Sequence, residues 1–263
     1  MISLELNLMR LLADYQEENK EVALITVISS DSVENCRTGD MLLVDENGKL
    51  LAGGIGNQLL QKKAIEQGQI CINRGLSRKV QVSAEGETIE VFINAFYRQD
   101  YLIIAGAGTV ALNIYKLASI LGYRTTILDH RAEVLTKERF PGACELLLGD
   151  IVKNLSLCTI TENTNIVIAT HHHEFDELAL QTVISSAARY IGVLGNSRRV
   201  SVYLKHLEPL NLAEELVSRV HSPIGLDLGG KRTVEIALAV VAEMQAVKYK
   251  RTGGFMSNTK QTN

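Results

Sequence analysis

The feature that most constrains the fold is a short glycine-rich segment between a predicted strand and a predicted helix. Residues 101–105 form an apolar run, and residues 106–111 follow with the pattern Gly-x-Gly-x-x-Ala. A second apolar run, at 125–128, ends in Asp129. In a strand–turn–helix of this kind the first glycine permits a tight turn, the second lets backbone approach a phosphate, and a small third residue lets helix pack on strand. The sequence therefore predicts a phosphate-binding βαβ unit.

We expect the ligand of this unit to contact the start of the helix, where free N–H groups and the positive end of the helix dipole favour a phosphate. Asp129 is placed to bond a ribose hydroxyl and Arg131 to accept a 2′-phosphate, so NAD and NADP both stay open. The predicted cofactor contacts here are Gly106, Ala107, Gly108, Thr109, Val110, Asp129, His130 and Arg131. The alternative is a domain of the same fold that has lost its nucleotide.

From residue 99 onward, predicted strands alternate with predicted helices. The strands are short continuous apolar runs, which is typical of a parallel sheet covered on both faces. They are expected at 101–105, 125–128, 145–148, 166–169 and 190–194, with helices at 108–121, 175–186 and about 233–249. This pattern predicts an α/β fold, with a Rossmann-like doubly wound parallel sheet over residues 99–251 and a polar, disordered tail at 252–263.

Residues 1–98 have a different pattern and predict a smaller N-terminal α+β domain. An amphipathic helix opens the chain, and a strand is expected at 21–28. Asn47-Gly48 lies between two apolar runs and predicts a hairpin, and Glu85-Gly86 predicts a second one. A glycine-rich loop at 53–56 precedes a helix expected at 57–66.

Charge, hydropathy and cysteine content disfavour several classes of protein. The net charge is −3, and no basic block is longer than residues 248–251, so nucleic acid is not an expected partner. The apolar run at 236–242 is too short to span a bilayer, and the start lacks a signal-peptide pattern, so no membrane association is expected. The four cysteines show no C-x-x-C spacing, which predicts reduced thiols in a cytoplasmic protein.

Three consecutive histidines, His171 to His173, directly follow the apolar run at 166–169. In a doubly wound sheet this loop lies at the carboxyl ends of the strands, on the same edge as the glycine turn. We therefore expect Thr170, His171 and His173 to contact the ligand, and the two histidines are also the candidates for catalysis. Two alternatives stay open: a metal site formed by His171, His173 and Asp176, and a polar loop that only starts the next helix.

Two further segments are expected at the same edge. The strand at 190–194 is followed by a glycine and two arginines, and the segment 220–233 is dense in glycine, which suits backbone that approaches a ligand closely. The predicted contacts in these segments are Gly195, Ser197, Arg198, Gly225 and Asp227. The alternative for both segments is a tight structural turn with solvated side chains.

Together these segments resemble the xanthine dehydrogenase accessory protein family (XdhC/CoxI type), whose members are maturation factors of molybdenum hydroxylases. The motifs that carry the resemblance are Gly106-Ala-Gly-Thr-Val110, Asp129-His-Arg131, Glu138-Arg-Phe-Pro-Gly-Ala143, Thr170-His-His-His-Glu-Phe-Asp176, Tyr190-Ile-Gly-Val-Leu-Gly-Asn-Ser-Arg198, His221-Ser-Pro-Ile-Gly-Leu-Asp-Leu-Gly229 and Glu235-Ile-Ala237. The series is specific because order and spacing agree over roughly residues 100–245, although no single motif would suffice. Within the family pattern T-H-x-H-x-x-D, His172 takes the variable position.

The resemblance implies an accessory protein, closer to a cofactor-handling chaperone than to a turnover enzyme. It would bind and hand over molybdenum cofactor (molybdopterin type), or help to sulfurate it, for a xanthine dehydrogenase-like apoenzyme. A homodimer and a cysteine desulfurase partner are implied as well. Residues 51–61 lack the cysteine that many relatives carry, which makes the first domain a degenerate version, and Cys36 is the one thiol nearby.

Two competing hypotheses follow from the glycine pattern without the family. One is an NAD(P)-dependent oxidoreductase in which His171 or His173 donates a proton near the hydride site. The other is a non-catalytic redox sensor that binds NAD(P) and reports its level. The motif series favours the accessory role over both, and the sequence also has no Ser-His-Asp or Cys-His nucleophile signature.

Overall fold

The computed structural model describes residues 2–30, 36–171, 173–195, 202–203, 205 and 214–258. The chain forms two compact units, Met1–Arg98 and Gln99–Asn263. The first unit contains a five-stranded antiparallel sheet in the order β3-β2-β1-β5-β4. Its elements are α1 (Ile2–Glu17), β1 (Val22–Ser29), β2 (Met41–Asp45), β3 (Leu50–Gly53), α2 (Gln58–Arg74), β4 (Arg78–Ala84) and β5 (Glu87–Phe96).

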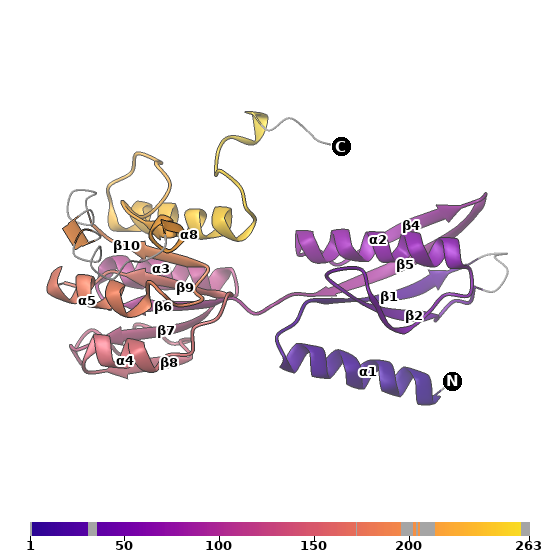
Figure 1. Cartoon of the computed structure of the whole chain (residues 1–263), viewed down its shortest axis with the longest axis horizontal. Coiled ribbons are helices and arrows are strands. Elements are labelled where there is room, and N and C mark those ends of the chain that lie inside the picture. Colours follow the sequence, from indigo (N-terminus) through magenta and orange to yellow (C-terminus); the bar gives the residue numbers. More distant parts are fainter. Residues whose placement is uncertain are drawn as a thin grey trace. The chain divides into compact units, whose positions relative to one another are not determined.

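The two helices of the first unit cover opposite faces of its sheet (Figure 1). Alternate residues of β1 point to opposite faces, as the pleat of a strand requires. Ile25 packs in the core under α2 with Leu60, whereas Val22 packs under α1 with Leu8. The predicted α+β domain is thus confirmed for this part of the chain, and its strands form one antiparallel sheet.

Helix α2 is longer than the sequence pattern predicts, because Gly68 does not interrupt it. A Cβ atom at Gly68 would lie 2.9 Å from Cδ1 of Ile25, so the glycine lets the helix pack closely on β1. The helix ends at Gly75, which adopts the left-handed conformation typical of a glycine after a helix. The two predicted hairpins are present, with Gly48 and Gly86 at positive φ in their turns.

The second unit is a doubly wound α/β domain with a six-stranded parallel sheet in the order β11-β10-β9-β6-β7-β8. Its strands are β6 (Tyr101–Ala105), β7 (Arg124–Asp129), β8 (Glu145–Leu148), β9 (Thr164–Ile168), β10 (Tyr190–Val193) and β11 (Val220–His221). Its α-helices are α3 (Thr109–Ile120), α4 (Ile151–Leu157), α5 (His173–Val183), α7 (Glu214–Ser218) and α8 (Thr233–Lys248).

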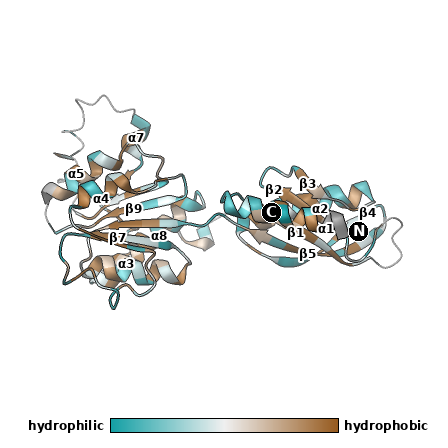
Figure 2. Cartoon of the chain, turned by 90° about the horizontal axis from the view of Figure 1, so that it is seen from below, coloured by the Kyte–Doolittle hydropathy of each residue, from teal (hydrophilic) through white to brown (hydrophobic). Residues whose placement is uncertain are grey.

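Helices cover both faces of this sheet, so its central strands are buried on both sides (Figure 1). On β6, Leu102 and Ile104 pack with α3 and α8, whereas Ile103 packs on the face covered by α4 and α5. Figure 2 colours the chain by hydropathy; within these layers the apolar, fully buried residues are Ile127 and Leu128 of β7 and Ile166, Val167 and Ile168 of β9. This double burial explains why the strands appear in the sequence as continuous apolar runs.

The order of the strands places a topological switch point between β6 and β9. The chain runs from β6 outward to β7 and β8, and then returns to add β9 on the other side of β6. The loops that follow β6 and β9 therefore leave the sheet in opposite directions at its carboxyl edge, which is where ligands of such folds bind. Both the glycine turn (residues 106–108) and the histidine segment (residues 169–171) begin at this point.

Several predicted boundaries were wrong for identifiable reasons. Helix α5 begins at His173, two residues earlier than predicted, so this histidine belongs to the helix and not to the loop. Helix α4 was not predicted because seven residues are too few to show a helical period. The tail predicted to be disordered contains a short 3-10 helix at Met256–Asn258, and residues 259–263 lie outside the described part.

Among the described helices, none has the length and apolar content needed to cross a membrane.

Candidate functional site

The glycine turn after β6 is held against the histidine segment so closely that a side chain cannot enter. Gly106 has φ +116°, and a Cβ atom there would lie 2.3 Å from the carbonyl oxygen of Ala169. The turn is fixed on both sides, because the N–H of Gly106 donates to Leu128 O at 2.7 Å and that of Ala169 donates to Ala105 O at 2.8 Å. Only glycine tolerates both this conformation and this contact.

Helix α3 starts at a glycine N-cap, which has no side chain of its own to bond the first N–H groups of the helix. Its N-cap is Gly108, and among the described residues no side chain caps it and its first turn contains no acidic residue. The exposed His171 lies over this start: a Cβ atom at Gly108 would be 3.9 Å from Cε1 of His171. The structure thus brings together the predicted contacts Gly106, Gly108 and His171, with Thr109 exposed at the first helical position.

Asp129 lies at the carboxyl end of β7 and holds the glycine turn in place by a hydrogen bond to its backbone. Its Oδ2 accepts hydrogen bonds from Ala107 N at 2.7 Å and Arg131 Nη2 at 2.9 Å, and its Oδ1 accepts them from Arg131 N at 2.9 Å and Nε at 3.0 Å. The side chain is 1% exposed. Burial raises the pKa of this carboxyl, but the hydrogen bonds from Arg131 and Ala107 outweigh burial and lower the pKa to about 2.

This geometry disagrees with the expectation that Asp129 binds a ribose and Arg131 a 2′-phosphate. Both carboxylate oxygens of Asp129 are already occupied by protein donors, so a ribose hydroxyl has no free acceptor there. Two nitrogens of the Arg131 guanidinium are directed at Asp129 instead of toward a ligand. His130 is more accessible: its side chain is 38% exposed, and its ring lies 5.7 Å from that of Phe175.

Arg139 supports the glycine turn and is absent from the contacts predicted above. Its Nη2 donates to the carbonyl oxygen of Ala107 at 3.0 Å. The next residue, Phe140, is buried and packs edge-on against Tyr115 of α3, whose hydroxyl accepts a hydrogen bond from Gly142 N at 2.7 Å. The segment that contains Arg139 therefore holds the turn and the helix together. In the sequence, the one sign that Arg139 matters is that it lies within the family motif at residues 138–143.

Asp176 organises the histidine segment from the first turn of α5. Its Oδ1 accepts hydrogen bonds from Thr170 Oγ1 at 2.6 Å and Thr170 N at 3.3 Å, and the residue is 2% exposed. This buried carboxylate fixes the backbone that leads into His171 and does not present itself to a metal ion. Within the described part of the chain, no group of three or more His, Cys, Asp or Glu residues could hold a metal. The side chain of His173 lies outside the described residues, as does His172.

The two remaining predicted segments contribute less. Gly195 follows β10 at the same edge and is half-buried, whereas Ser197 and Arg198 lie outside the described residues. Gly225 has φ +98°, and its Cβ would lie 3.1 Å from Cβ of Ala239 in α8. The close approach that requires glycine at 225 is thus to a helix of the same domain, and Asp227 is exposed in the loop beyond it.

Glu243 of α8 holds Gly225 and two aromatic residues in one network. Its Oε2 accepts hydrogen bonds from Tyr190 Oη at 2.5 Å and Gly225 N at 2.9 Å, and its Oε1 lies 3.3 Å from Nδ1 of His221. The rings of Tyr190 and His221 stack at 4.6 Å. Burial raises the pKa of Glu243, but the bonds with His221, Tyr190 and Gly225 lower it overall. The network anchors the 222–225 segment and is structural.

In the first unit, the thiol near the degenerate segment does not have the surroundings of a nucleophile. Cys36 is buried in the core with Ile55, and burial raises its pKa. A thiol in such surroundings stays protonated and inert at neutral pH. The loop before α2 is instead held by Gln61, whose Oε1 accepts a hydrogen bond from Ile55 N at 2.8 Å.

Models of one protein family match both parts of the chain. A model described as the XdhC Rossmann domain matches residues 102–244, and a model of the XdhC and CoxI family matches residues 15–83. The chain is 29% identical over 259 residues to an uncharacterized protein, YqeB, of Escherichia coli (93% of this chain, 47% of that protein). It is 30% identical over 158 residues to a protein of Bacillus subtilis described as a probable xanthine dehydrogenase subunit (60% of this chain, 46% of that protein).

The chain spans about half the length of these curated relatives. Among solved structures, one described as a xanthine dehydrogenase from Bacillus halodurans superposes with a TM-score of 0.54 at 19% identity, covering 95% of this chain and 97% of that one. This likeness concerns the fold.

Proposed function

Because the chain belongs to the XdhC and CoxI family, with an XdhC Rossmann domain at residues 102–244, we propose that it is an accessory factor for a xanthine dehydrogenase-type molybdenum hydroxylase. In this role it binds the molybdenum cofactor at the carboxyl edge of its parallel sheet and hands it over. The description of the Bacillus subtilis relative as part of a xanthine dehydrogenase supports the partner class.

The observation that carries the proposal is the start of α3 beside His171, which no side chain caps among the described residues. The turn at Gly106 brings backbone to the switch point, Gly108 adds no side chain of its own to the first N–H groups of the helix, and His171 lies above them. A molybdopterin-type cofactor carries a phosphate, and such a helix start is a favourable seat for one. The residues present therefore fit the phosphate of this group.

The residues of the chain divide into those that contact the ligand and those that position them. Backbone N–H groups of residues 108–110 hold the phosphate, and His171 contacts the ligand from the opposite wall. Asp129, Arg139 and Asp176 keep the two loops in place by hydrogen bonds to Ala107 and Thr170. When bound, the cofactor supplies the molybdenum centre for the partner enzyme, and this chain binds, orients and shields it.

The state of Asp129 favours this role over the two nicotinamide alternatives. A dinucleotide site of this fold uses the acid after the second strand to bond a ribose hydroxyl. Here both oxygens of that acid are occupied by protein donors in a buried position. An NAD(P)-dependent oxidoreductase or an NAD(P) sensor would have to do without this contact, whereas a phosphate held at α3 does not need it.

The proposal is tested by anaerobic calorimetric titration of the full chain with molybdenum cofactor, NADH and NADPH in turn. We expect saturable binding of molybdenum cofactor and much weaker binding of both nucleotides. His171→Ala should weaken cofactor binding by about tenfold, the loss of one charge-assisted contact, whereas His172→Ala should change it little. Tight binding of NADH with no affinity for molybdenum cofactor would contradict the proposal, and so would equal losses in the two histidine variants.

A homodimer and a cysteine desulfurase partner also belong to the proposed role. Sedimentation at several protein concentrations tests the first, because a dimer has twice the mass of the single chain. Co-sedimentation with a purified cysteine desulfurase tests the second. If the chain is monomeric at all concentrations and ignores the desulfurase, these two parts of the role are wrong, while the titration still decides on the cofactor.

A further inference from the structure

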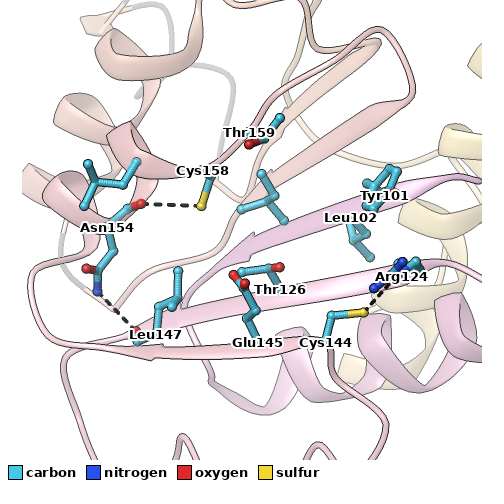
Figure 3. Close-up of a pocket in the computed structure, with 12 residues that line it drawn as sticks. Tyr101, Leu102, Arg124, Thr126, Cys144, Glu145, Leu147, Asn154, Cys158 and Thr159 are labelled. Atoms are coloured by element: carbon cyan, nitrogen blue, oxygen red, sulfur yellow. Dashed lines mark hydrogen bonds between the residues drawn. The ribbon is translucent and has the colours of Figure 1, made fainter. Parts of the chain in front are cut away.

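A cavity of about 390 Å³ lies at the amino edge of the parallel sheet, on the face covered by α4 (Figure 3). It is built on the first residues of three neighbouring strands, Tyr101, Arg124 and Glu145. Asn154 and Leu157 of the seven-residue helix α4, and Cys158 and Thr159 after it, also line the cavity. The carboxyl-edge site is formed by other residues, so the proposed cofactor function does not account for this cavity.

Two thiols line the cavity, and their surroundings differ (Figure 3). Cys144, directly before β8, is exposed, and its Sγ accepts a hydrogen bond from Nε of Arg124 at 3.3 Å. Cys158, at the end of α4, is half-buried and donates to Asn154 O at 3.4 Å. Burial raises the pKa of the Cys158 thiol. Cys144 therefore has an accessible sulfur beside a guanidinium, whereas the sulfur of Cys158 is half-buried and hydrogen-bonded to the backbone.

The charges around Cys144 indicate what kind of small molecule the cavity accepts. The Arg124 guanidinium lies 5.8 Å from the centre of the Tyr101 ring, so it has a flat support and can pair with a carboxylate. The exposed Glu145, next in sequence to Cys144, offers an acceptor for an ammonium group. Ile103, Leu147 and Leu157 supply apolar walls between these charges. One cation and one anion around a thiol match a zwitterionic ligand better than a phosphate or a purely apolar one.

We propose that this cavity is an S-thiolation site, in which Cys144 forms a mixed disulfide with a small disulfide that carries an α-amino carboxylate. Glutathione disulfide and cystine share this chemistry. Arg124 holds the carboxylate, Glu145 holds the ammonium group, and the cavity holds the portion that becomes attached. The proposal does not depend on the role of the carboxyl edge.

The reaction is a thiol–disulfide exchange that balances without a further reactant. The Cys144 thiolate attacks one sulfur of the small disulfide, a new bond forms between Sγ and that sulfur, and the original S–S bond breaks. The departing thiolate takes up the proton that the Cys144 thiol released. Cys144 is oxidised to the disulfide level, and the departing half of the reagent is reduced to a thiol. Excess small thiol reverses the step.

The test uses the full chain, reduced, freed of reductant and treated with glutathione disulfide or cystine in separate arms. Intact-mass spectrometry and peptide mapping should find a single adduct on Cys144, while the buried Cys36 and Cys71 stay free. N-acetylcysteine at the same pH serves as the free-thiol reference, and Cys144 should react several-fold faster than it does. An adduct on Cys158 instead, or a Cys144 rate no higher than the reference, overturns the proposal.

A second arm separates recognition from simple exposure. Cystamine has the same reactive S–S bond and two ammonium groups but no carboxylate, so it should react more slowly with Cys144 than cystine does. Arg124→Gln should slow the cystine reaction by about two- to fivefold, the effect expected of a solvent-exposed charge contact, and should remove the preference over cystamine. Arg10→Gln, at an exposed arginine on α1, is the matched control and should change neither rate. If cystine and cystamine react alike with the unaltered chain, the site has no recognition of a carboxylate and the proposal fails.

Discussion

Replacing Asp129 by asparagine tests whether this residue braces the glycine turn or is held ready for a ligand. Four donors converge on its two oxygens: Ala107 N, and the N, Nε and Nη2 atoms of Arg131. Asparagine has the same shape but replaces one acceptor oxygen by an NH₂ group, which would face two of these donors. The substitution therefore removes two hydrogen bonds and leaves the Arg131 charge without its partner.

The size of the effect follows from the pKa of Asp129. A carboxyl whose pKa is 3.8 when unperturbed and about 2 in the folded chain contributes ~2 kcal/mol of stability at neutral pH, at 1.36 kcal/mol per pKa unit. The donors left facing one another add to this loss, so we expect Asp129→Asn to destabilise the second unit by about 3 kcal/mol. Because the folded pKa is the lower one, this contribution is complete above pH 3.8 and is lost as the pH falls toward 2.

Urea-dependent hydrogen exchange of peptides spanning residues 102–129 measures this locally, without interference from the first unit. The matched control is Asp150→Asn, in which the carboxylate also accepts a backbone hydrogen bond, from Lys153 N at 2.9 Å, but at an exposed helix start. Asp150→Asn should lower the free energy of unfolding by about 1 kcal/mol or less. If Asp129→Asn costs no more than the control, the carboxylate is not a brace, and its assignment as a ribose ligand regains support.

Two further perturbations concern the packing of the domain. In urea unfolding, Gly106→Ala should destabilise the second unit by about 3 kcal/mol or more, because its Cβ would lie 2.3 Å from Ala169 O at a residue whose φ is +116°. Gly108→Ala is the control and should lower the free energy of unfolding by less than about 1 kcal/mol, because the nearest atom to its Cβ is 3.9 Å away. Similar losses for the two variants would contradict the geometry of the turn. Glu243→Gln should destabilise the second unit by about 1–2 kcal/mol, because Tyr190 and Gly225 lose a charged hydrogen-bond acceptor. The difference in stability between this variant and the unaltered chain should shrink as the pH falls below 4.5, because Glu243 then becomes protonated. A difference that does not change with pH in acid would show that the charge is unimportant.

The central features of the fold follow from local sequence. Continuous apolar runs predicted the parallel sheet, and the Gly106 pattern identified the strand–turn–helix at its centre, because double burial and a tight turn each leave a strong local signal. The position of the histidine segment beside this turn was also predictable, since adjacent parallel strands end at one edge. The placement of His171 near Gly108 agrees with that expectation.

The parts that sequence reasoning missed depend on contacts between distant residues. Asp129 has the position of a ribose ligand in the sequence, and only the fold reveals that Ala107 and Arg131 occupy it. Gly225 appears free to approach a ligand until α8 is seen packed against it. The cavity beside Cys144 has no sequence signature at all, because residues from three different strands and from the end of α4 line it.

The most direct test of the proposed binding site is hydrogen exchange of the full chain with and without bound molybdenum cofactor, measured anaerobically by mass spectrometry. We predict slower exchange in two segments that meet at the switch point, residues 106–111 and 169–171, and unchanged exchange around the cavity at Arg124 and Cys144. Slower exchange confined to any other region, or no change at a saturating cofactor concentration, would contradict the assignment of the carboxyl edge as the binding site.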